Sequence, residues 1–197
     1  MRTILCLLLI SSVTLLSCKK EVPVEDPFKA FWDTFKGDVT AQVNGFPATR
    51  NGHSLHVRGS LYKAPGWDSS RAAISLILVT GNRETRQTMG MGSFPARPGT
   101  YPILYSSDFA RSNKSDTICT SFLSLFGADG DALLENYYIL PSEINYIKIT
   151  YIDKTEIRGE FNVGFRKNSG TSRSNIPETI VYTNGKFNAK ITMNVVE

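Results

Sequence analysis

Histidines and cysteines, the side chains that most often bind metals or act as nucleophiles, are sparse in this chain. Its 197 residues include two histidines, His53 and His56, and three cysteines, Cys6, Cys18 and Cys119. Because odd and even positions of a β-strand point to opposite faces, the two histidines would not converge on one ligand. A zinc site needs three or four ligands. We therefore expect surface histidines, no metal site and no other cofactor.

Glu156 and Glu160 form the carboxylate pair that most invites a catalytic interpretation, because glycoside hydrolases work with two such groups. Four residues of strand span roughly 13 Å, whereas the carboxyl groups of glycosidases lie ~5–5.5 Å or ~6.5–9.5 Å apart. Arg158 also stands between the two glutamates on the same face of the expected strand. The spacing therefore predicts an exposed ladder of alternating charge.

The rest of the sequence holds no recognisable catalytic motif. The serine nucleophile elbow, the His-Glu-x-x-His zinc motif and the phosphate-binding loop are all absent from it. Asp129, Asp131 and Glu135 lack the spacing of a calcium-binding EF-hand loop and predict a polar hairpin tip. We therefore expect that the protein is not an enzyme. A hydrolase whose residues meet only in the folded chain is the alternative.

Cys18 lies at the end of the stretch that predicts where the protein is exported. Arg2, an apolar run over residues 4–16 and the small Ser17 form the three parts of a secretory signal. The run is shorter than the ~20 residues that a membrane-spanning helix needs. The Leu-Ser-Cys ending resembles the lipobox of bacterial lipoproteins, which implies cleavage of residues 1–17 and attachment of fatty acids, such as palmitate, to Cys18.

The resemblance leads us to expect an outer-membrane lipoprotein of the bacterial cell envelope, anchored in the lipid bilayer through acylated Cys18. Its periplasmic or surface exposure stays open. An ordinary signal peptide with a chance cysteine at the cleavage site is the alternative. Residues 18–36 would form the lipidated tether, because the polar stretch 19–27 contains two prolines. Phe28, Phe31, Trp32 and Phe35 then follow with the spacing of one helical face, which predicts a short helix that packs on the domain or, alternatively, lies on the membrane.

Composition favours one folded domain after the signal. Removal of residues 1–17 leaves 197 − 17 = 180 residues, and the chain is 41% hydrophobic and 20% charged. Positive and negative charges are interspersed without a basic stripe, so we expect no nucleic-acid partner. Cys119 is the only cysteine beside Cys18 in the mature chain and lies in an apolar segment, which predicts a buried thiol without a disulfide partner inside the domain.

From residue 37 onward, apolar and polar residues alternate with the period of two that marks strands with one buried face. Asn44-Gly45 and Asn184-Gly185 are dipeptides typical of tight β-hairpins. The apolar segment 72–79 predicts a central strand covered on both faces, whereas the glycines and prolines of 90–99 predict a long loop. Residues 37–197 are expected to form a single all-β domain, an antiparallel β-sandwich of about ten strands, with an open β-barrel as the alternative.

Four short tracts of this domain, 39–45, 98–101, 157–161 and 183–187, contain the patterns TAxVNG, GTY, GxF and NGxF. Together with the lipobox, they resemble a family of uncharacterised lipoproteins from Bacteroidota. The resemblance spans most of the mature chain, although the matched positions are turn glycines and alternating apolar residues. It implies an all-β domain of unknown function in the cell envelope, and it supplies no catalytic residues.

Two aromatic residues and one threonine complete the candidate site residues. Trp67 lies in a loop of small polar residues and Tyr62 shortly before it, and aromatic side chains in such a setting suit stacking on a sugar or a peptide. Asp116-Thr117-Ile118 resembles the O-glycosylation acceptor of Bacteroidota, although a plain strand start fits these residues too. We expect a non-catalytic module that binds a glycan, a peptide or an envelope protein; a structural or assembly component of the outer membrane is the alternative.

Overall fold

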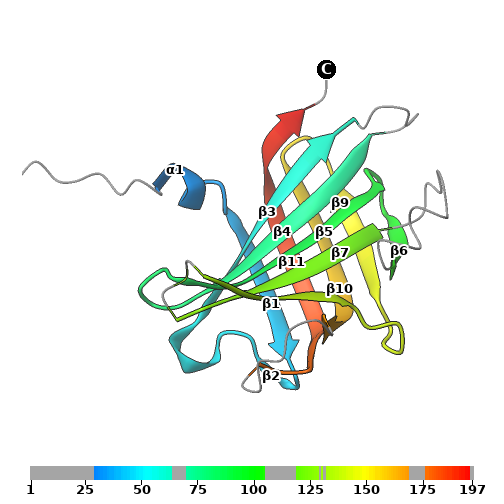
Figure 1. The fold of residues 1–197 in the computed structure, drawn as a ribbon. Coiled ribbons are helices and arrows are strands. Elements are labelled where there is room, and N and C mark those ends of the chain that lie inside the picture. The colour runs from blue at the N-terminus through cyan, green and yellow to red at the C-terminus, as the bar shows by residue number, and fades with distance from the viewer. Residues whose placement is uncertain are drawn as a thin grey trace, which may run out of the picture. The chain divides into compact units, whose positions relative to one another are not determined.

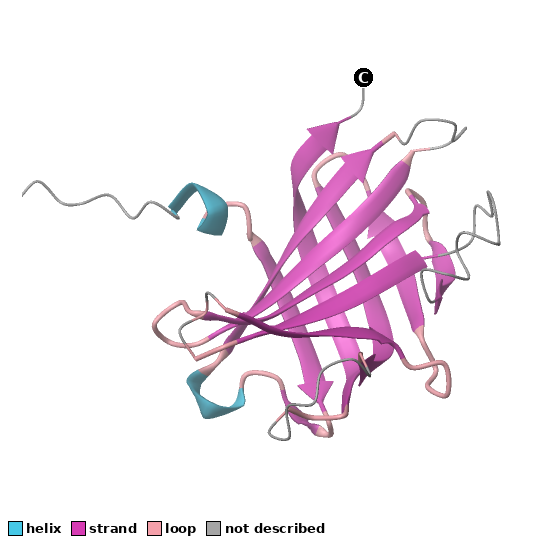
Figure 2. Ribbon diagram, viewed as in Figure 1, coloured by secondary structure: helices cyan, strands magenta, loops and turns pink. Residues whose placement is uncertain are grey.

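The computed structural model describes residues 29–63, 70–104, 119–128, 130, 132–168 and 176–195. These residues form strands, one short α-helix and one 3-10 turn (Figure 2). None of the described helices is long and apolar enough to cross a membrane. In chain order, the elements are α1 (Lys29–Trp32), β1 (Gly37–Val43), β2 (Phe46–Pro47), η1 (Arg50–Gly52), β3 (Ser54–Tyr62), β4 (Arg71–Val79), β5 (Thr85–Pro95), β6 (Gly99–Leu104), β7 (Cys119–Phe126), β8 (Leu133–Ile139), β9 (Tyr146–Ile152), β10 (Glu156–Lys167) and β11 (Thr179–Val195).

Eight of these strands pair edge to edge into a closed barrel (Figure 1). The order around the ring is β3, β4, β5, β7, β6, β9, β10 and β11, and the pairing of β11 with β3 closes it. Most neighbours run antiparallel, whereas the β11–β3 and β6–β7 pairs run parallel. Closure satisfies the backbone hydrogen-bonding groups that an open sheet would leave along its edges.

Three strands of the ring, β7, β10 and β11, each pair with three neighbours. One edge of β11 pairs with β10, and the other pairs with β1 from Tyr182 to Ala189 and with β3 from Ile191 onward. In Figure 1, β1 accordingly runs beside β11 although the two are far apart in sequence. The edge of β7 opposite β5 likewise carries both β8 and β6. The edge of β10 opposite β11 carries β9 and then β8. The barrel wall therefore branches at these three strands, and β1, β2 and β8 are the strands added to the eight.

The all-β prediction with one short helix is confirmed, but the described strands do not form the expected β-sandwich. They form the alternative, a barrel, and this barrel is closed. The alternation of apolar and polar residues requires only that each strand has one buried and one wet face, which holds in both architectures. The pairings that close the ring join β3 to β11 and β6 to β9, and no local pattern encodes them.

Apolar side chains fill the barrel interior. Inward and outward positions alternate along each strand, and an eight-stranded barrel is just wide enough for its own side chains to fill it. Burial of each large apolar side chain stabilises the fold by roughly 1.5–3 kcal/mol. The largest of these, with no more than 1% of their surface exposed, are Phe94, Phe161, Phe165, Ile74, Leu76, Met91, Leu123, Ile147 and Ile157.

A second apolar cluster lies on the outer face of β4. Ile77 and Val79 alternate with inward-facing residues of that strand, and Phe35 and Trp32 pack against them. β4 is therefore covered on both faces, as the apolar segment 72–79 predicts. Trp32 and Phe35 therefore pack on the domain, in agreement with the first of the two placements expected for the aromatic stretch; Phe28 lies outside the described residues.

The segment 90–99 is largely a strand, so the prediction of a long loop is wrong. β5 continues through Gly90 and Gly92 to Pro95, paired with β4 on one side and β7 on the other. At Gly90, the exposed ring of Phe122 on the neighbouring β7 lies in the space that a Cβ would fill. Gly90, which resembles a loop signal in the sequence, thus lies within a strand and in close contact with the strand beside it.

The two Asn-Gly dipeptides have different structures. Asn44-Gly45 forms the predicted hairpin, with Val43 opposite Phe46 and both turn residues at positive φ. Asn184-Gly185 does not reverse the chain, because β11 continues through it and its register with β10 shifts at that point. Asn184 has φ 53°. A left-handed residue can serve a β-bulge as well as a hairpin, and here the long-range pairing of β11 decides between them.

Gly159 marks the tightest approach of two backbones in the wall. It lies on β10, buried between β9 and β11, at a shift in the β9–β10 register. A Cβ at this position would overlap the carbonyl oxygen of Lys148 and approach the ring of Phe187. A backbone oxygen cannot swing away as a flexible side chain can, so a larger residue must push β9 and β10 apart.

We predict that Gly159→Ala lowers the free energy of unfolding by about 1–3 kcal/mol, the usual cost of overpacking, and the Tm by roughly 2–10 °C. Thermal unfolding followed by circular dichroism measures the effect. The matched control is Gly92→Ala, where the new Cβ would lie 3.5 Å from the Cβ of Ala73, an ordinary contact. Equal stability of the two variants would contradict the assigned β9–β10 packing.

Candidate functional site

Of the site residues expected from the sequence, the structure describes Tyr62 alone; Cys18, Trp67 and Thr117 lie outside the described residues. Tyr62 is the last residue of β3 and is half-buried. Its hydroxyl forms a hydrogen bond of 2.9 Å with the Ser93 Oγ of β5. The hydroxyl is thus engaged within the domain, which ties the end of β3 to the end of β5.

The same end of the barrel holds Arg71 and Cys119, both fully buried. Arg71 lies opposite Tyr62 in the β3–β4 pair and donates a hydrogen bond to the carbonyl oxygen of Ser93. Burial raises the pKa of the Cys119 thiol far above its ordinary value, more than the nearby Gly92 backbone and Arg71 lower it. The thiol is therefore buried, as the sequence predicts, and is protonated rather than nucleophilic at neutral pH.

The two histidines do not form a ligand set. His56 lies on the outer face of β3, with its ring 6.4 Å from that of Trp32 and its Nε2 3.0 Å from the Ser54 Oγ. Partial burial, and then the charge of Arg83, lower the pKa of His56. Within the described residues, no three His, Cys, Asp or Glu side chains gather as a metal site would require.

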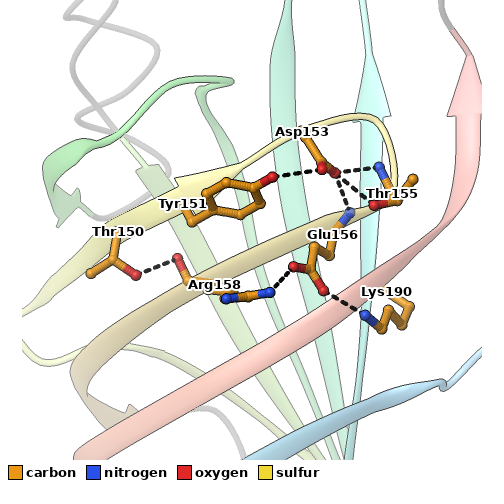
Figure 3. A network of polar contacts seen from close by, with 7 residues as sticks. All are labelled: Thr150, Tyr151, Asp153, Thr155, Glu156, Arg158 and Lys190. Atoms are coloured by element: carbon orange, nitrogen blue, oxygen red, sulfur yellow. Dashed lines mark hydrogen bonds and ion pairs between the residues drawn. The ribbon is translucent and has the colours of Figure 1, made fainter.

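A polar network covers the outer face where β9 turns into β10 (Figure 3). The carboxylate of Asp153 accepts hydrogen bonds from the Tyr151 hydroxyl at 2.8 Å, from the backbone and hydroxyl of Thr155 at 2.6 and 2.8 Å, and from the Glu156 backbone at 2.9 Å. These donors hold the pKa of Asp153 well below its ordinary value. The carboxylate thus stays ionised and locks the turn.

Glu156 occupies the centre of this network, held between Lys190 on β11 and Arg158 on its own strand. Only 9% of its side chain is exposed. The guanidinium of Arg158 in turn lies 5.1 Å from the centre of the Tyr151 ring, in a cation–π contact. The hydrogen bond from Lys190 and the contacts with Arg158 lower the pKa of Glu156 despite its partial burial.

Glu156, Arg158 and Glu160 alternate in charge along this face as predicted, but Glu156 is nearly buried rather than exposed. Glu160, two positions beyond Arg158, pairs with Lys148 on β9 at 3.7 Å. Glu156 and Glu160 thus each neutralise their own lysine or arginine partners. A general acid needs a raised pKa, whereas that of Glu156 is lowered, so this pair is structural.

The lowered pKa of Glu156 predicts how stability depends on pH. Because the folded-state pKa lies below the ordinary 4.5, the ion pairs contribute fully above pH 4.5 and are lost as pH falls through the folded-state value. Glu156→Gln should therefore have a lower Tm than the wild type at pH 7 and a shallower loss of Tm below pH 4.5. The control is Glu143→Gln, an exposed carboxylate in the turn before β9; parallel pH profiles of wild type and Glu156→Gln would contradict the assignment.

At the opposite end of the barrel from Tyr62, a carboxylate points inward. Tyr137 and Ile139 of β8 belong to the core, so alternation directs Glu135 to the same side. Leu125, its partner across the β7–β8 pair, also packs against the core. Glu135 is 4% exposed. The sequence predicts Glu135 at a polar hairpin tip, but the residue lies within β8.

One carboxylate oxygen of Glu135 has no partner. Its Oε1 accepts a hydrogen bond of 2.9 Å from the backbone of Asn136, whereas Oε2 is buried without a hydrogen bond in the part of the chain that the structure describes. Burial raises the pKa of the adjacent Tyr137 to about 12, and the charges of Glu135 and Glu178 add to this rise. An uncompensated charge in the interior destabilises a fold by several kcal/mol.

Other polar side chains reach the same end of the interior from neighbouring strands. Lys167 is opposite Tyr137 in the β8–β10 pair; its side chain is 7% exposed, and its Nζ lies 3.4 Å from the Glu178 carboxylate. Tyr182 of β11 donates from its hydroxyl to the Oε1 of Gln87 on β5. The hydroxyl of Tyr137 donates to the Pro177 carbonyl at 2.7 Å. We call this set the inner polar cluster: Gln87, Glu135, Tyr137, Lys167 and Tyr182.

The inner polar cluster combines both kinds of hydrogen-bonding group. Glu135 offers an acceptor, the Lys167 ammonium carries three donor protons, and the Gln87 amide nitrogen donates while its oxygen accepts. The sequence alone does not predict the inner polar cluster. Lys167 continues the inward series Phe161, Val163 and Phe165, and that periodicity was the available signal. The cluster forms only because barrel closure brings β5, β8, β10 and β11 together.

Comparisons with known proteins add nothing to this assignment. No family model, no curated protein and no solved structure matches the chain. Its function is therefore inferred from the chemistry of its own residues.

Proposed function

We propose that the protein is a lipid-anchored envelope protein whose β-barrel is a non-catalytic module that binds a polar ligand at the inner polar cluster. The signal sequence and the Leu-Ser-Cys ending support the anchor at Cys18. The single observation that carries the binding function is the Oε2 of Glu135, which is buried and has no hydrogen-bond partner among the described residues.

A buried carboxylate with one free oxygen calls for a functional explanation. A neutral or apolar side chain of similar size would stabilise the barrel more, because it avoids the cost of burying a charge. Natural proteins retain such unfavourable groups chiefly where binding or catalysis needs them. A ligand that donates a hydrogen bond to Oε2 would satisfy the carboxylate, and the mouths of β-barrels are common ligand sites.

The charges near Glu135 favour a hydroxyl-bearing ligand over a simple cation. Lys167 lies opposite Tyr137 in the β8–β10 pair, with its Nζ on the exposed Glu178 carboxylate, and its positive charge disfavours a cationic ligand. A sugar carries several hydroxyls that both donate and accept hydrogen bonds, so its chemistry suits a carboxylate, an ammonium and an amide at one end of a site. The proposed ligand class is therefore the end of a glycan.

The binding function predicts opposite effects of Glu135→Gln on stability and on affinity. The variant keeps the shape of the side chain but removes the charge, so we expect a Tm higher by roughly 2–6 °C in the unliganded protein. On a glycan array, binding by the mature protein in detergent should fall at least about ten-fold, the loss of one charge-assisted hydrogen bond.

The control for this experiment is Glu160→Gln, which removes a carboxylate from the outer wall. Its side chain is 42% exposed. Glu160→Gln should therefore neither weaken glycan binding nor raise the Tm. The proposed binding function would be contradicted if the wild-type protein binds no glycan, or if Glu135→Gln binds glycan as tightly as the wild type.

The anchor has its own test. Wild type should incorporate labelled palmitate and sediment with membranes, because two or more acyl chains hold a protein stably in a bilayer. Cys18→Ala should lose the label and appear in the aqueous fraction. Cys119→Ala is the matched control, because that thiol is buried and should carry no lipid. Equal labelling of wild type and Cys18→Ala would exclude the anchor.

A further inference from the structure

An aromatic cluster with one exposed ring lies on the outer wall of the barrel beside β3 and β4. Phe35 is buried on Ile77 and Val79, and Trp32 packs partly against the same residues. The ring of Phe31 contacts both, with centroids 5.4 Å from Trp32 and 5.3 Å from Phe35. Phe31 nevertheless remains 42% exposed, so the cluster presents an apolar surface to its surroundings.

Arg58 of β3 fixes this cluster to the wall. Its guanidinium lies 4.8 Å from the centre of the Phe35 ring and 5.8 Å from that of Phe31, and its Nη1 donates to the Thr34 Oγ1 at 3.0 Å. The rings and the cation thus hold one another in place without covering Phe31. We call Phe31, Trp32, Phe35 and Arg58 the aromatic patch.

We propose that the aromatic patch rests on the bilayer that holds the anchor, with Phe31 inserted among the lipid headgroups. This inference rests on the lipid anchor proposed above. Phe31 follows Cys18 by 31 − 18 = 13 residues, which span at most about 47 Å even when fully extended. The patch is therefore the part of the described domain that the tether keeps nearest to the bilayer along the chain.

The chemistry of the patch suits a membrane interface. Aromatic rings with polar or cationic neighbours are typical of proteins at the level of the headgroups. Lys29 and Lys36 are exposed close to Phe31 in the chain, and so are Asp33 and Asp38. Because these charges balance, apolar contact rather than attraction to anionic lipid should dominate, and the interaction should depend only weakly on salt.

The test attaches the mature chain to vesicles whether or not cells acylate it. The Cys18 thiol of residues 18–197 is coupled to a maleimide-bearing lipid, and the buried Cys119 does not compete. The vesicles contain phosphatidylethanolamine and phosphatidylglycerol, part of the lipid being brominated near the headgroup. In a Trp67→Phe background, Trp32 is the single tryptophan, and quenching of its emission reports contact of the patch with lipid.

We expect quenched, blue-shifted Trp32 emission that changes little with added salt. Phe31→Ser should shift the equilibrium between docked and undocked states by about ten-fold toward the undocked state. Phe46→Ser is the matched control, because Phe46 is 55% exposed and also lies under an arginine, Arg50 at 4.5 Å, but beyond the other end of β1. It should leave the quenching unchanged.

Two results would overturn the inference. Unquenched Trp32 in coupled protein would mean that the domain stands off the bilayer, and equal effects of Phe31→Ser and Phe46→Ser would mean that the patch has no special contact. Either outcome is independent of palmitate labelling in cells. A failure of the anchor and a failure of the patch are thus told apart.

Discussion

The fold depends on the last strand of the chain. β11 pairs with β10 along one edge and with both β1 and β3 along the other, so it joins the first strand, the third strand and the C-terminal hairpin. Without the β11–β3 contact the wall would be an open sheet with exposed edges. The partners lie more than a hundred residues apart, and such non-local pairing carries a large loop-closure entropy that only the completed core offsets.

Closure of the barrel also determines how deeply the polar side chains at inward positions are buried. In an open sheet, residues near the ends of strands can turn their polar groups to water. In a ring of eight strands the interior is narrow and filled by side chains, so Glu135 and Lys167 are nearly buried although they lie near strand ends. The outer wall shows the contrast: Glu156 is also nearly buried, but Lys190 and Arg158 satisfy both of its carboxylate oxygens.

The two proposed contacts use separate parts of the barrel. The aromatic patch is built on the outward residues of β3 and β4, whereas the inner polar cluster belongs to the inward residues of β5, β8, β10 and β11. Because alternation separates the two faces of every strand, a protein of this kind can rest on a surface with one set of residues and bind a ligand with the other. Rigid pairing around the ring holds both sets in place.

Local patterns in the sequence determined the strand content, the Asn44-Gly45 hairpin, the burial of Cys119 and the charge ladder of β10. Each depends on neighbours within a few residues, whose periodicity and turn chemistry can be read directly. The tertiary structure alone decided that the sheet closes, that Asn184-Gly185 is a bulge and that Gly90 lies within a strand. It alone brought Glu135 and Lys167 to one end of the interior. These features depend on which strand edges meet, and because every strand edge carries the same backbone donors and acceptors, only the packing of the whole barrel selects among the pairings.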